Sequence, residues 1–133
     1  MQKDIKKLKI AKATVIDAQA IRKLEHMVWK EEVVNKYDIP MFVTFGYVYV
    51  ALYENKLVGA IISYRTNKDE VYVCDLVVDP KYRTLGIGEK LYRKLISSVR
   101  GKNVVSFLDP TLIPTVKLHE KLGAKVVAKV NNP

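Results

Sequence analysis

The sequence has little of several features that would otherwise decide its class. It has one cysteine, Cys74, so no disulfide can form within the chain. No apolar run is long enough to cross a membrane, and the lysine-rich first residues lack the apolar core of a signal peptide. Only two histidines are present, and no ligand cluster surrounds them. We therefore expect a cytoplasmic protein with no membrane span, no internal disulfide and no bound metal.

Two common phosphate-binding motifs are also missing. The Walker pattern requires GxxxxGK followed by serine or threonine, and the chain has no such run. The dinucleotide pattern GxGxxG fails because Leu91 stands where the third glycine would be. The sequence also has no internal repeat and no low-complexity segment. A P-loop enzyme and a GxGxxG dinucleotide-binding protein are therefore not expected.

Composition and charge describe an ordinary globular chain with a basic surface. The 133 residues suit one domain, 1–133, and hydrophobic residues make up 49% of them. The formal net charge is +9, and much of the excess lies near the N-terminus. A nucleic-acid surface would bring interleaved exposed aromatics or a reading helix, and we find neither. We interpret these lysines as a solvated tail and strand edge, so nucleic acid is not an expected partner.

The stretch Asp75–Leu95, DLVVDPKYRTLGIGEKLYRKL, organises the chain. It reads as an apolar strand that breaks at Asp79-Pro80, crosses a basic loop, and turns through Gly86-Ile87-Gly88 into an amphipathic helix. A helix start presents unpaired N–H groups and the positive end of its dipole, and glycine lets a bound group come close. This combination predicts an anion site, most often for phosphate. The alternative is a glycine turn that only joins two core elements.

The hydrophobic pattern predicts ten elements in the order β-α-α-β-β-β-α-β-α-β, an α+β fold with a mixed sheet flanked by helices. The expected strands are a short one around Leu8–Ile10, then Tyr47–Tyr53, Leu57–Tyr64, Glu70–Val78, Val104–Leu108 and Val126–Val130. The expected helices are Asp17–Met27, Trp29–Tyr37 ending before Pro40, Gly88–Arg100 and Val116–Leu122. Simple alternation along residues 70–78 predicts that Tyr72, Cys74, Leu76 and Val78 share one face and that Val71, Val73, Asp75 and Val77 share the other.

Two motifs resemble those of one known family. Arg83-x-x-Gly86-x-Gly88, preceded by LVVDPKY, resembles the acyl-CoA signature (Q/R)xxGxG/A of the GNAT acetyltransferases. The segment 116–124, VKLHEKLGA, resembles the family's AIxLYEKLGF segment. The predicted order of elements also matches that of GNAT proteins over essentially the whole chain. The resemblance implies an N-acetyltransferase that moves an acetyl group from acetyl-CoA to an amine.

The resemblance also implies where acetyl-CoA binds. Backbone N–H groups of the glycine turn would hold the pyrophosphate, with charge from Arg83 and nearby Lys81, and the strand edge before the turn would pair with the pantetheine arm. The expected cofactor-binding residues are Leu76, Val77, Val78, Arg83, Thr84, Leu85, Gly86, Ile87, Gly88 and Glu89.

Three side chains are candidates for proton transfer. His119 stands where relatives have a tyrosine that protonates the leaving thiolate, and an imidazole can donate a proton. Tyr72 and Asp75 lie on the strand where a base for the amine is expected, and Glu70 on the same strand is a further candidate. A surface histidine and core strand residues are the structural alternatives. An acyl-cysteine intermediate on Cys74 is a further option, although a lone cysteine on an apolar strand is usually a small buried hydrophobe.

The resemblance implies that residues 29–45 help to shape the acceptor site. The large apolar residues of this stretch, which core packing would explain equally well, are Trp29, Tyr37, Met41 and Phe45. Glu31 and Glu32 could attract a cationic amine or form a solvated face. The sequence does not identify the amine.

The chain departs from the family pattern in ways that leave a second reading open. Leu112 replaces a usual asparagine, His119 replaces the tyrosine, and residues 124–133 are too few for two further strands. A missing strand could come from a neighbouring subunit, which would make a homodimer. The alternative function is a catalytically weak or inactive GNAT-fold module that binds acyl-CoA as a sensor.

Overall fold

The computed structural model describes residues 3–31 and 33–130. Within these ranges, five strands form one sheet in the order β1-β2-β3-β4-β5, in which the first four are antiparallel and β5 runs parallel to β4. The strands are β1 (Leu8–Lys12), β2 (Tyr47–Tyr53), β3 (Lys56–Asn67), β4 (Glu70–Val78) and β5 (Asn103–Ser106). The helices are α1 (Ala18–Trp29), α2 (Ile39–Phe45), α3 (Ile87–Ser98) and α4 (Ile113–Lys121). Three short 3-10 helices are η1 (Ile5–Lys7), η2 (Val15–Asp17) and η3 (Pro80–Leu85).

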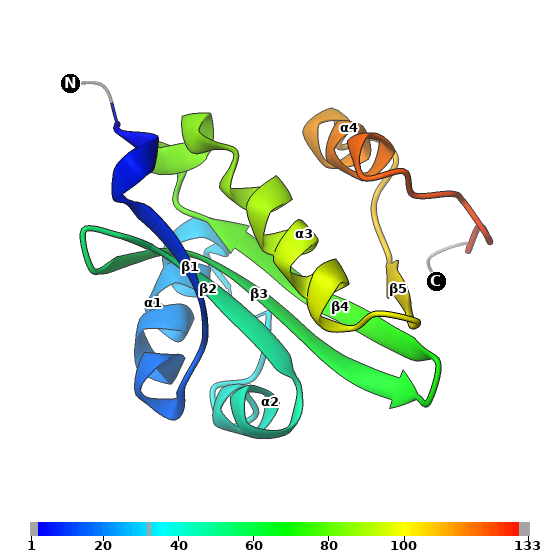
Figure 1. Ribbon diagram of the computed structural model, residues 1–133, viewed down its shortest axis with the longest axis horizontal. Helices are drawn as coiled ribbons and strands as arrows, with labels where there is room; N and C mark the ends of the chain where they lie inside the picture. Colours follow the sequence, from blue (N-terminus) through cyan, green and yellow to red (C-terminus); the bar gives the residue numbers. More distant parts are fainter. Residues whose placement is uncertain (1–2, 32, 131–133) are drawn as a thin grey trace.

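The sheet separates two layers of helices (Figure 1). Helices α1 and α2 cover one face and bury an apolar cluster that includes Ile21 and Ile39. Helix α3 covers the other face and buries a cluster that includes Ile87, Leu91 and Leu95. Because each helix has one apolar stripe, each buries that stripe against the sheet and leaves its charged face in water. The expected α+β fold with a mixed sheet between helices is confirmed.

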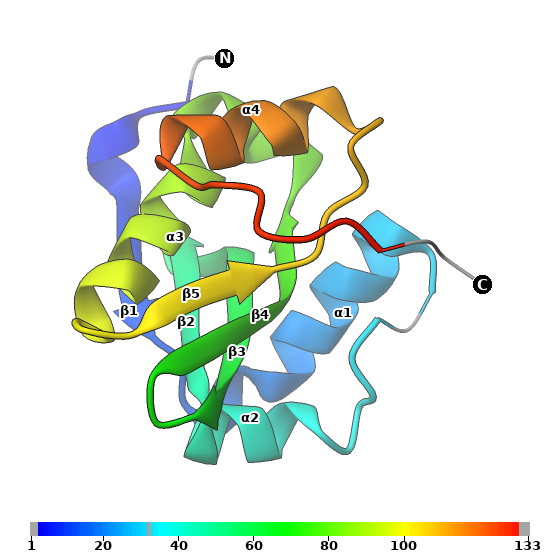
Figure 2. The same cartoon turned by 90° about the vertical axis from the view of Figure 1, so that its right-hand side faces the viewer.

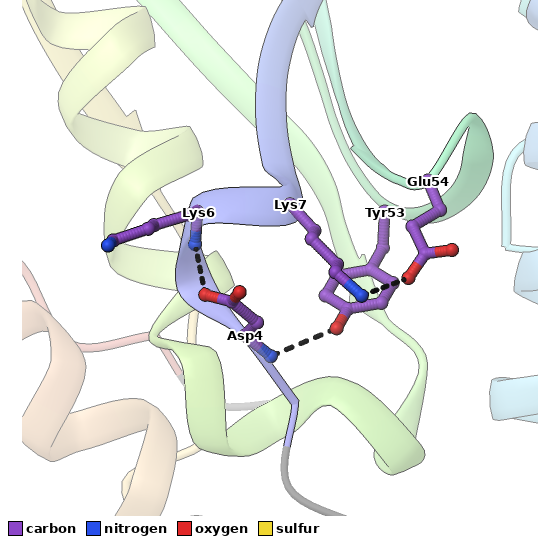
Figure 3. Close-up of polar contacts among 5 residues, drawn as sticks. All are labelled: Asp4, Lys6, Lys7, Tyr53 and Glu54. Carbon is purple, nitrogen blue, oxygen red and sulfur yellow. Dashed lines mark hydrogen bonds and ion pairs between the residues drawn. The ribbon is translucent and has the colours of Figure 1, made fainter.

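The lysine-rich N-terminal segment is tied to the end of the β2–β3 hairpin (Figure 3). The backbone N–H of Asp4 donates to the Tyr53 hydroxyl at 2.9 Å. The Lys7 ammonium lies 3.1 Å from the Glu54 carboxylate, and both side chains are more than half exposed. Glu54 and Asn55 form the hairpin turn with positive φ values of 48° and 69°. These contacts agree with a solvated strand edge anchored on the hairpin.

The expected helix at Trp29–Tyr37 is wrong. Helix α1 ends where Lys30 takes the left-handed conformation, with φ of 62°. The second helix starts later, at Ile39, and Pro40 lies in its first turn. Proline is tolerated there because the first N–H groups of a helix have no partner within the helix. Pro40 therefore helps to start α2, whereas we had expected it to follow the end of a helix.

The expected alternation of faces along β4 is also wrong, because the strand contains a bulge. The pairing with β3 passes from Val73 opposite Ser63 to Asp75 opposite Ile62, so Cys74 is the extra residue. Val73 before the bulge and Leu76 after it pack in the α3 cluster, whereas Cys74 and Val77 pack in the α1 cluster. The bulge therefore turns Asp75 toward the side of the sheet that carries α1.

The expected last strand, Val126–Val130, does not form in the described part of the chain. Residues 124–130 have no regular secondary structure, and the side chains of Val126 and Val127 are 80% and 87% exposed. The strand β5, which ends the sheet on one side, is only four residues long. Figure 2 shows this segment running between α4 and β5, across the chain that leaves β5. Among the described residues, no helix is long and apolar enough to cross a membrane.

Candidate functional site

The sheet opens between β4 and β5. Their pairing ends at Val73 and Ser106, after which the chain leaves β5 and passes to α4 while β4 continues (Figure 2). Residues Asp75–Val78 pair with β3 on one side and, within the described ranges, with no strand on the other. An extended group placed in this gap would find backbone N–H and C=O groups along the edge of β4. Leu76, Val77 and Val78, which we expected to bind the cofactor, lie on this open edge.

The glycine turn leads from this edge into α3. The buried carboxylate of Asp79 accepts from the backbone N–H of Lys81 at 3.0 Å and so starts η3. Gly86 then takes the left-handed conformation, with φ of 67°, and a Cβ built on it would meet no atom within 4 Å. The backbone N–H of Lys90 is the first in α3 that donates a hydrogen bond back to this turn, and its acceptor is the Gly86 carbonyl. The N–H groups of residues 87–89 precede it and point out of the helix start.

Exposed cations flank this helix start, and Gly88 lies behind it against β4 and α4. Arg83 and Lys81 are exposed on η3, as a binding site for an anion requires. A Cβ on Gly88 would lie 3.4 Å from a Leu118 methyl and 3.5 Å from a Leu76 methyl. A Cβ at position 88 would therefore make ordinary van der Waals contacts with β4 and α4, whereas Gly86 leaves open space in front of the turn.

Glu89 links the start of α3 to α4. Its carboxylate lies 2.8 Å from the Lys121 ammonium and 2.8 Å from the Arg93 guanidinium. Hydrogen bonds from Lys121 and then Arg93 lower the pKa of Glu89 to about 2. The negative charge of Glu89 is thus matched by two cations, and the first-turn amides remain available to an anion.

His119 belongs to a polar cluster that we did not predict, made with Tyr92 of α3 and Ser106 of β5. Its Nδ1 lies 2.8 Å from the Thr115 carbonyl, which can only accept, so Nδ1 carries the hydrogen. Nε2 is then the acceptor in the neutral ring, and the Ser106 hydroxyl lies 2.9 Å from it. The Tyr92 hydroxyl lies 3.2 Å from the same nitrogen and 3.4 Å from the Ser106 hydroxyl. Both nitrogens of the imidazole are therefore engaged within the protein.

The cluster holds protons on its hydroxyls at neutral pH. Tyr92 is buried, and burial raises the pKa of its hydroxyl above the ordinary value near 10. Ser106 ends β5 at the point where the sheet opens. With the ring neutral, Ser106 donates its one hydrogen to Nε2; with Nε2 protonated, the ring donates to Ser106 and the serine hydrogen is free for a neighbouring group.

Tyr72 lies in a row of aromatic rings across the face that carries α2. Its ring is 5.7 Å from that of Tyr64 and 5.9 Å from that of Phe107, and Tyr64 stacks on Phe42 at 5.3 Å. Burial raises the pKa of the Tyr72 hydroxyl. Tyr72 therefore stays protonated at neutral pH, where it can donate or relay a proton but is a weak base.

Asp75 is buried against α1. Its side chain is hydrogen-bonded to the side chains of Glu25 and Trp29, and only 7% of the residue is exposed. Burial raises the pKa of Asp75. His119 and Asp75 come from different layers of the molecule, since the bulge turns Asp75 toward α1 while His119 contacts Tyr92 of α3. The three expected catalytic residues therefore do not form one cluster.

Cys74 is poorly suited to nucleophilic attack. Its thiol donates to the Ile62 carbonyl at 3.3 Å. Burial, followed by the nearby charge of Asp75, raises the pKa of this thiol to about 12. The thiolate is the reactive form of cysteine, so this environment argues against an acyl-cysteine intermediate.

The region that we expected to shape the acceptor site is largely exposed. The large side chains there are between 43% and 82% exposed, and they are Trp29, Tyr37, Met41 and Phe45. Core packing therefore does not explain them. Glu31 is exposed, and Glu32 lies outside the described residues. In residues 3–31 and 33–130, no three His, Cys, Asp or Glu side chains are grouped so that they could hold a metal ion.

The sequence did not predict the residues that hydrogen-bond to the candidate catalytic side chains. Tyr92 occupies a position on the apolar stripe of α3, and Ser106 is one polar residue at the end of an apolar strand. Glu25 carried the one available signal, because it is a charged residue directly beside Leu24 on the apolar stripe of α1. A charged residue that a helix buries requires a partner.

Comparison with known proteins gives one family. A sequence model described as the acetyltransferase (GNAT) family matches residues 17–124. A search of curated proteins found no match.

Solved structures of acetyltransferases share the fold at low sequence identity. An aminoglycoside acetyltransferase from an uncultured soil metagenomic sample is 22% identical, with a TM-score of 0.78 over 96% of this chain and 94% of that one. The ribosomal-protein-S18-alanine N-acetyltransferase from Escherichia coli is 20% identical, with a TM-score of 0.75 over 87% and 76%. Diaminobutyrate acetyltransferase from Paenibacillus lautus, solved with its substrate and coenzyme A, is 16% identical, with a TM-score of 0.76 over 86% and 74%.

The match covers most of the chain, and the glycine turn and the opening between β4 and β5 both lie within it. The expected family is therefore confirmed: this chain belongs to the GNAT family of acetyltransferases.

Proposed function

We propose that this protein transfers the acetyl group of acetyl-CoA to a primary amine by direct attack of the amine on the thioester. The observation that carries the proposal is the open helix start at Gly86 next to the unpaired edge of β4. When bound, acetyl-CoA supplies the activated acetyl group. The chain's own residues bind it, orient it and handle the protons.

Binding would use the turn and the strand edge together. The N–H groups of residues 87–89 would hold the pyrophosphate at the positive end of α3, and Arg83 and Lys81 would add charge. The open space in front of Gly86 fits this role, since a side chain there would fill it. Backbone groups of Leu76–Val78 would pair with the amide-bearing arm, and one N–H would polarise the thioester carbonyl.

The two proton transfers would use different parts of the site, Asp75 for one and the cluster around His119 for the other. An amine with an ordinary pKa of about 10.4 must lose a proton before it attacks, and Asp75 is a candidate acceptor for that proton. The departing thiolate must gain a proton, and Ser106 is a candidate donor whose own hydrogen would be replaced from a protonated His119. The acceptor would approach from the exposed aromatic region beside α1 and α2.

Turnover on three probe amines tests the proposal. The structural relatives suggest sisomicin, a peptide with N-terminal alanine and L-2,4-diaminobutyric acid as the probes. Release of the CoA thiol that requires both acetyl-CoA and a probe, with acetylated probe detected by mass spectrometry, would support transfer. Tight binding of acetyl-CoA without turnover on any of the three would favour the alternative, a GNAT-fold module that binds acyl-CoA without catalysis.

A further inference from the structure

The carboxyl groups of Glu25 and Asp75 meet in the interior between α1 and β4. Glu25 is 2% exposed and Asp75 is 7% exposed, and their side chains are hydrogen-bonded to one another. Two carboxylates in contact away from water repel each other strongly, so the pair is expected to hold one proton between them. A single shared proton also provides the hydrogen that joins the two groups.

The two ends of this pair lie in different surroundings. Asp75 follows the bulge at Cys74, on the stretch of β4 where β5 no longer pairs. Its Oδ2 atom has no hydrogen-bond partner among the described residues. Glu25 lines a cavity of about 240 Å³ beside α1, together with Arg22, His26, Glu31 and Val34. The pair therefore lies between the open part of β4 and the cavity on the α1 side.

We propose that Glu25 and Asp75 act as one proton-carrying unit, which takes up the proton lost by the acceptor amine at β4 and passes it to the cavity beside α1. This inference rests on the proposed acetyl transfer and assigns a role to Glu25 within it. Asp75 is the group nearer to the reaction, and Glu25 is a positioning and relay residue that acts through Asp75. Trp29, which is also hydrogen-bonded to Asp75, holds that carboxyl in place.

The protons balance as follows for an amine that arrives as an ammonium ion. Its first proton moves to the singly charged pair, which becomes neutral, and then leaves through Glu25 to water in the cavity. The free amine forms the new C–N bond as the C–S bond breaks. Its second proton ends on the sulfur of CoA. Burial raises the pKa of Asp75, which makes the charged pair a stronger base than a solvated carboxylate.

Other titratable groups near the pair would modify its pH dependence. Arg22, His26 and Glu31 share the cavity with Glu25. Cys74 on β4 interacts electrostatically with both carboxyls, and Tyr92 on α3 interacts with Asp75. Neither the thiol nor the phenol is ionised at neutral pH, because the pKa of each is raised. The charge of the pair at pH 7 is therefore set by its own shared proton and by the cavity side chains.

Carboxyl carbon NMR across pH 3 to 10 tests the shared proton directly. In the wild-type protein we expect two separate titration steps, with one proton still bound to the pair at pH 7. In Glu25→Gln and in Asp75→Asn, one carboxyl remains, and we expect a single step that is complete below pH 7. The exposed swap Glu54→Gln controls for the substitution itself and should leave the pair unchanged. Two fully ionised carboxyls at pH 7 in the wild type would overturn the proposal.

Kinetics on the three probe amines test the role in transfer. At pH 7, Asp75→Asn should lower kcat/KM about 100-fold and Glu25→Gln about tenfold. The loss should shrink toward pH 10, where the amine loses its proton to water, and a loss that is equal at every pH would overturn the relay. Acetyl-CoA affinity and the melting temperature, measured for both variants, separate this outcome from a misfolded protein. If the wild type binds no acetyl-CoA, the proposed function fails, whereas the NMR result on the pair stands by itself.

Discussion

The Ser106 hydroxyl lies 2.9 Å from Nε2 of His119, and this contact joins the end of β5 to α4 where the sheet opens. Since Nδ1 of His119 donates to Thr115, Nε2 is left to accept from Ser106. The histidine thus lies behind the hydroxyls of Ser106 and Tyr92, and these hydroxyls are the donors of the cluster.

We predict that His119→Ala lowers kcat about 100-fold, the lower range for loss of general acid catalysis. Ser106→Ala should produce a smaller loss in the same direction, because Tyr92 still reaches the imidazole. The measurement is thiol release with a probe amine. Ser97→Ala, at an exposed serine of α3 that bonds only to its own helix, is the control. Full activity of His119→Ala would show that the cluster is structural.

We predict that Cys74 resists alkylation in the folded protein. With a pKa of about 12, roughly one thiol in 10⁴ is ionised at pH 8. Iodoacetamide labelling followed by mass spectrometry should therefore be slow for the native protein and fast in concentrated urea. Rapid native labelling would contradict the buried, hydrogen-bonded thiol. For the same reason, Cys74→Ala should retain acetyl transfer.

We predict that Glu89 stabilises the fold in a pH-dependent way. Its folded pKa of about 2 lies below the ordinary value of 4.5, so the native state binds this proton more weakly than the unfolded chain does. The contribution is present above pH 4.5 and is lost as the pH falls toward 2. Urea unfolding should find Glu89→Gln less stable than wild type at pH 7 and equal to it near pH 2. Glu120→Gln, an exposed glutamate on α4, is the control; a Glu89→Gln deficit that is the same at both pH values would contradict the prediction.

We predict that Leu91→Ala costs about 2–5 kcal/mol of unfolding free energy, as large-to-small changes in a packed core do. Leu91 is fully buried in the cluster between α3 and the sheet. Ile96 on the same helix is 41% exposed, and Ile96→Ala should cost much less. Urea midpoints for the two variants provide the comparison. Equal losses of unfolding free energy in the two variants would mean that α3 does not bury its Leu91 face against the sheet.

The local sequence predicted those helices and strands whose ends are marked by charged residues, glycine or proline next to an apolar run. The strand Glu70–Val78 was predicted with the observed ends, because charged residues and Asp79-Pro80 delimit an apolar run. Gly86 was identified from its place in the turn, and its positive φ explains the glycine. The predictions were wrong where contacts between distant parts of the chain determine the local structure. Pro40 fits either after a helix or in a first turn, and the bulge at Cys74 depends on the register with β3.

The polar partners of the site follow from long-range packing. Tyr92, Ser106 and His119 come from three elements, and their meeting point depends on how α4 returns over the end of β5. Glu25 and Asp75 are 50 positions apart, and the bulge determines that they face one another. The sequence marks Glu25 as a charged residue on an apolar stripe, but it does not identify Asp75 as its partner, and it does not predict that Tyr92, Ser106 and His119 meet.

The most direct test of the central claim is calorimetric titration of acetyl-CoA into the wild-type protein, Gly86→Glu and Gly101→Glu. Both glycines have positive φ, 67° and 81°, and both face open space, so each substitution places a side chain on a left-handed backbone. Gly86 starts α3 at the proposed pyrophosphate site, whereas Gly101 follows the other end of that helix. We predict that the wild type and Gly101→Glu bind alike, and that Gly86→Glu binds at least about tenfold more weakly because its carboxylate repels the phosphates. Equal binding by all three proteins, or no binding by the wild type, would contradict the account and leave the turn at Gly86 as a connection between β4 and α3.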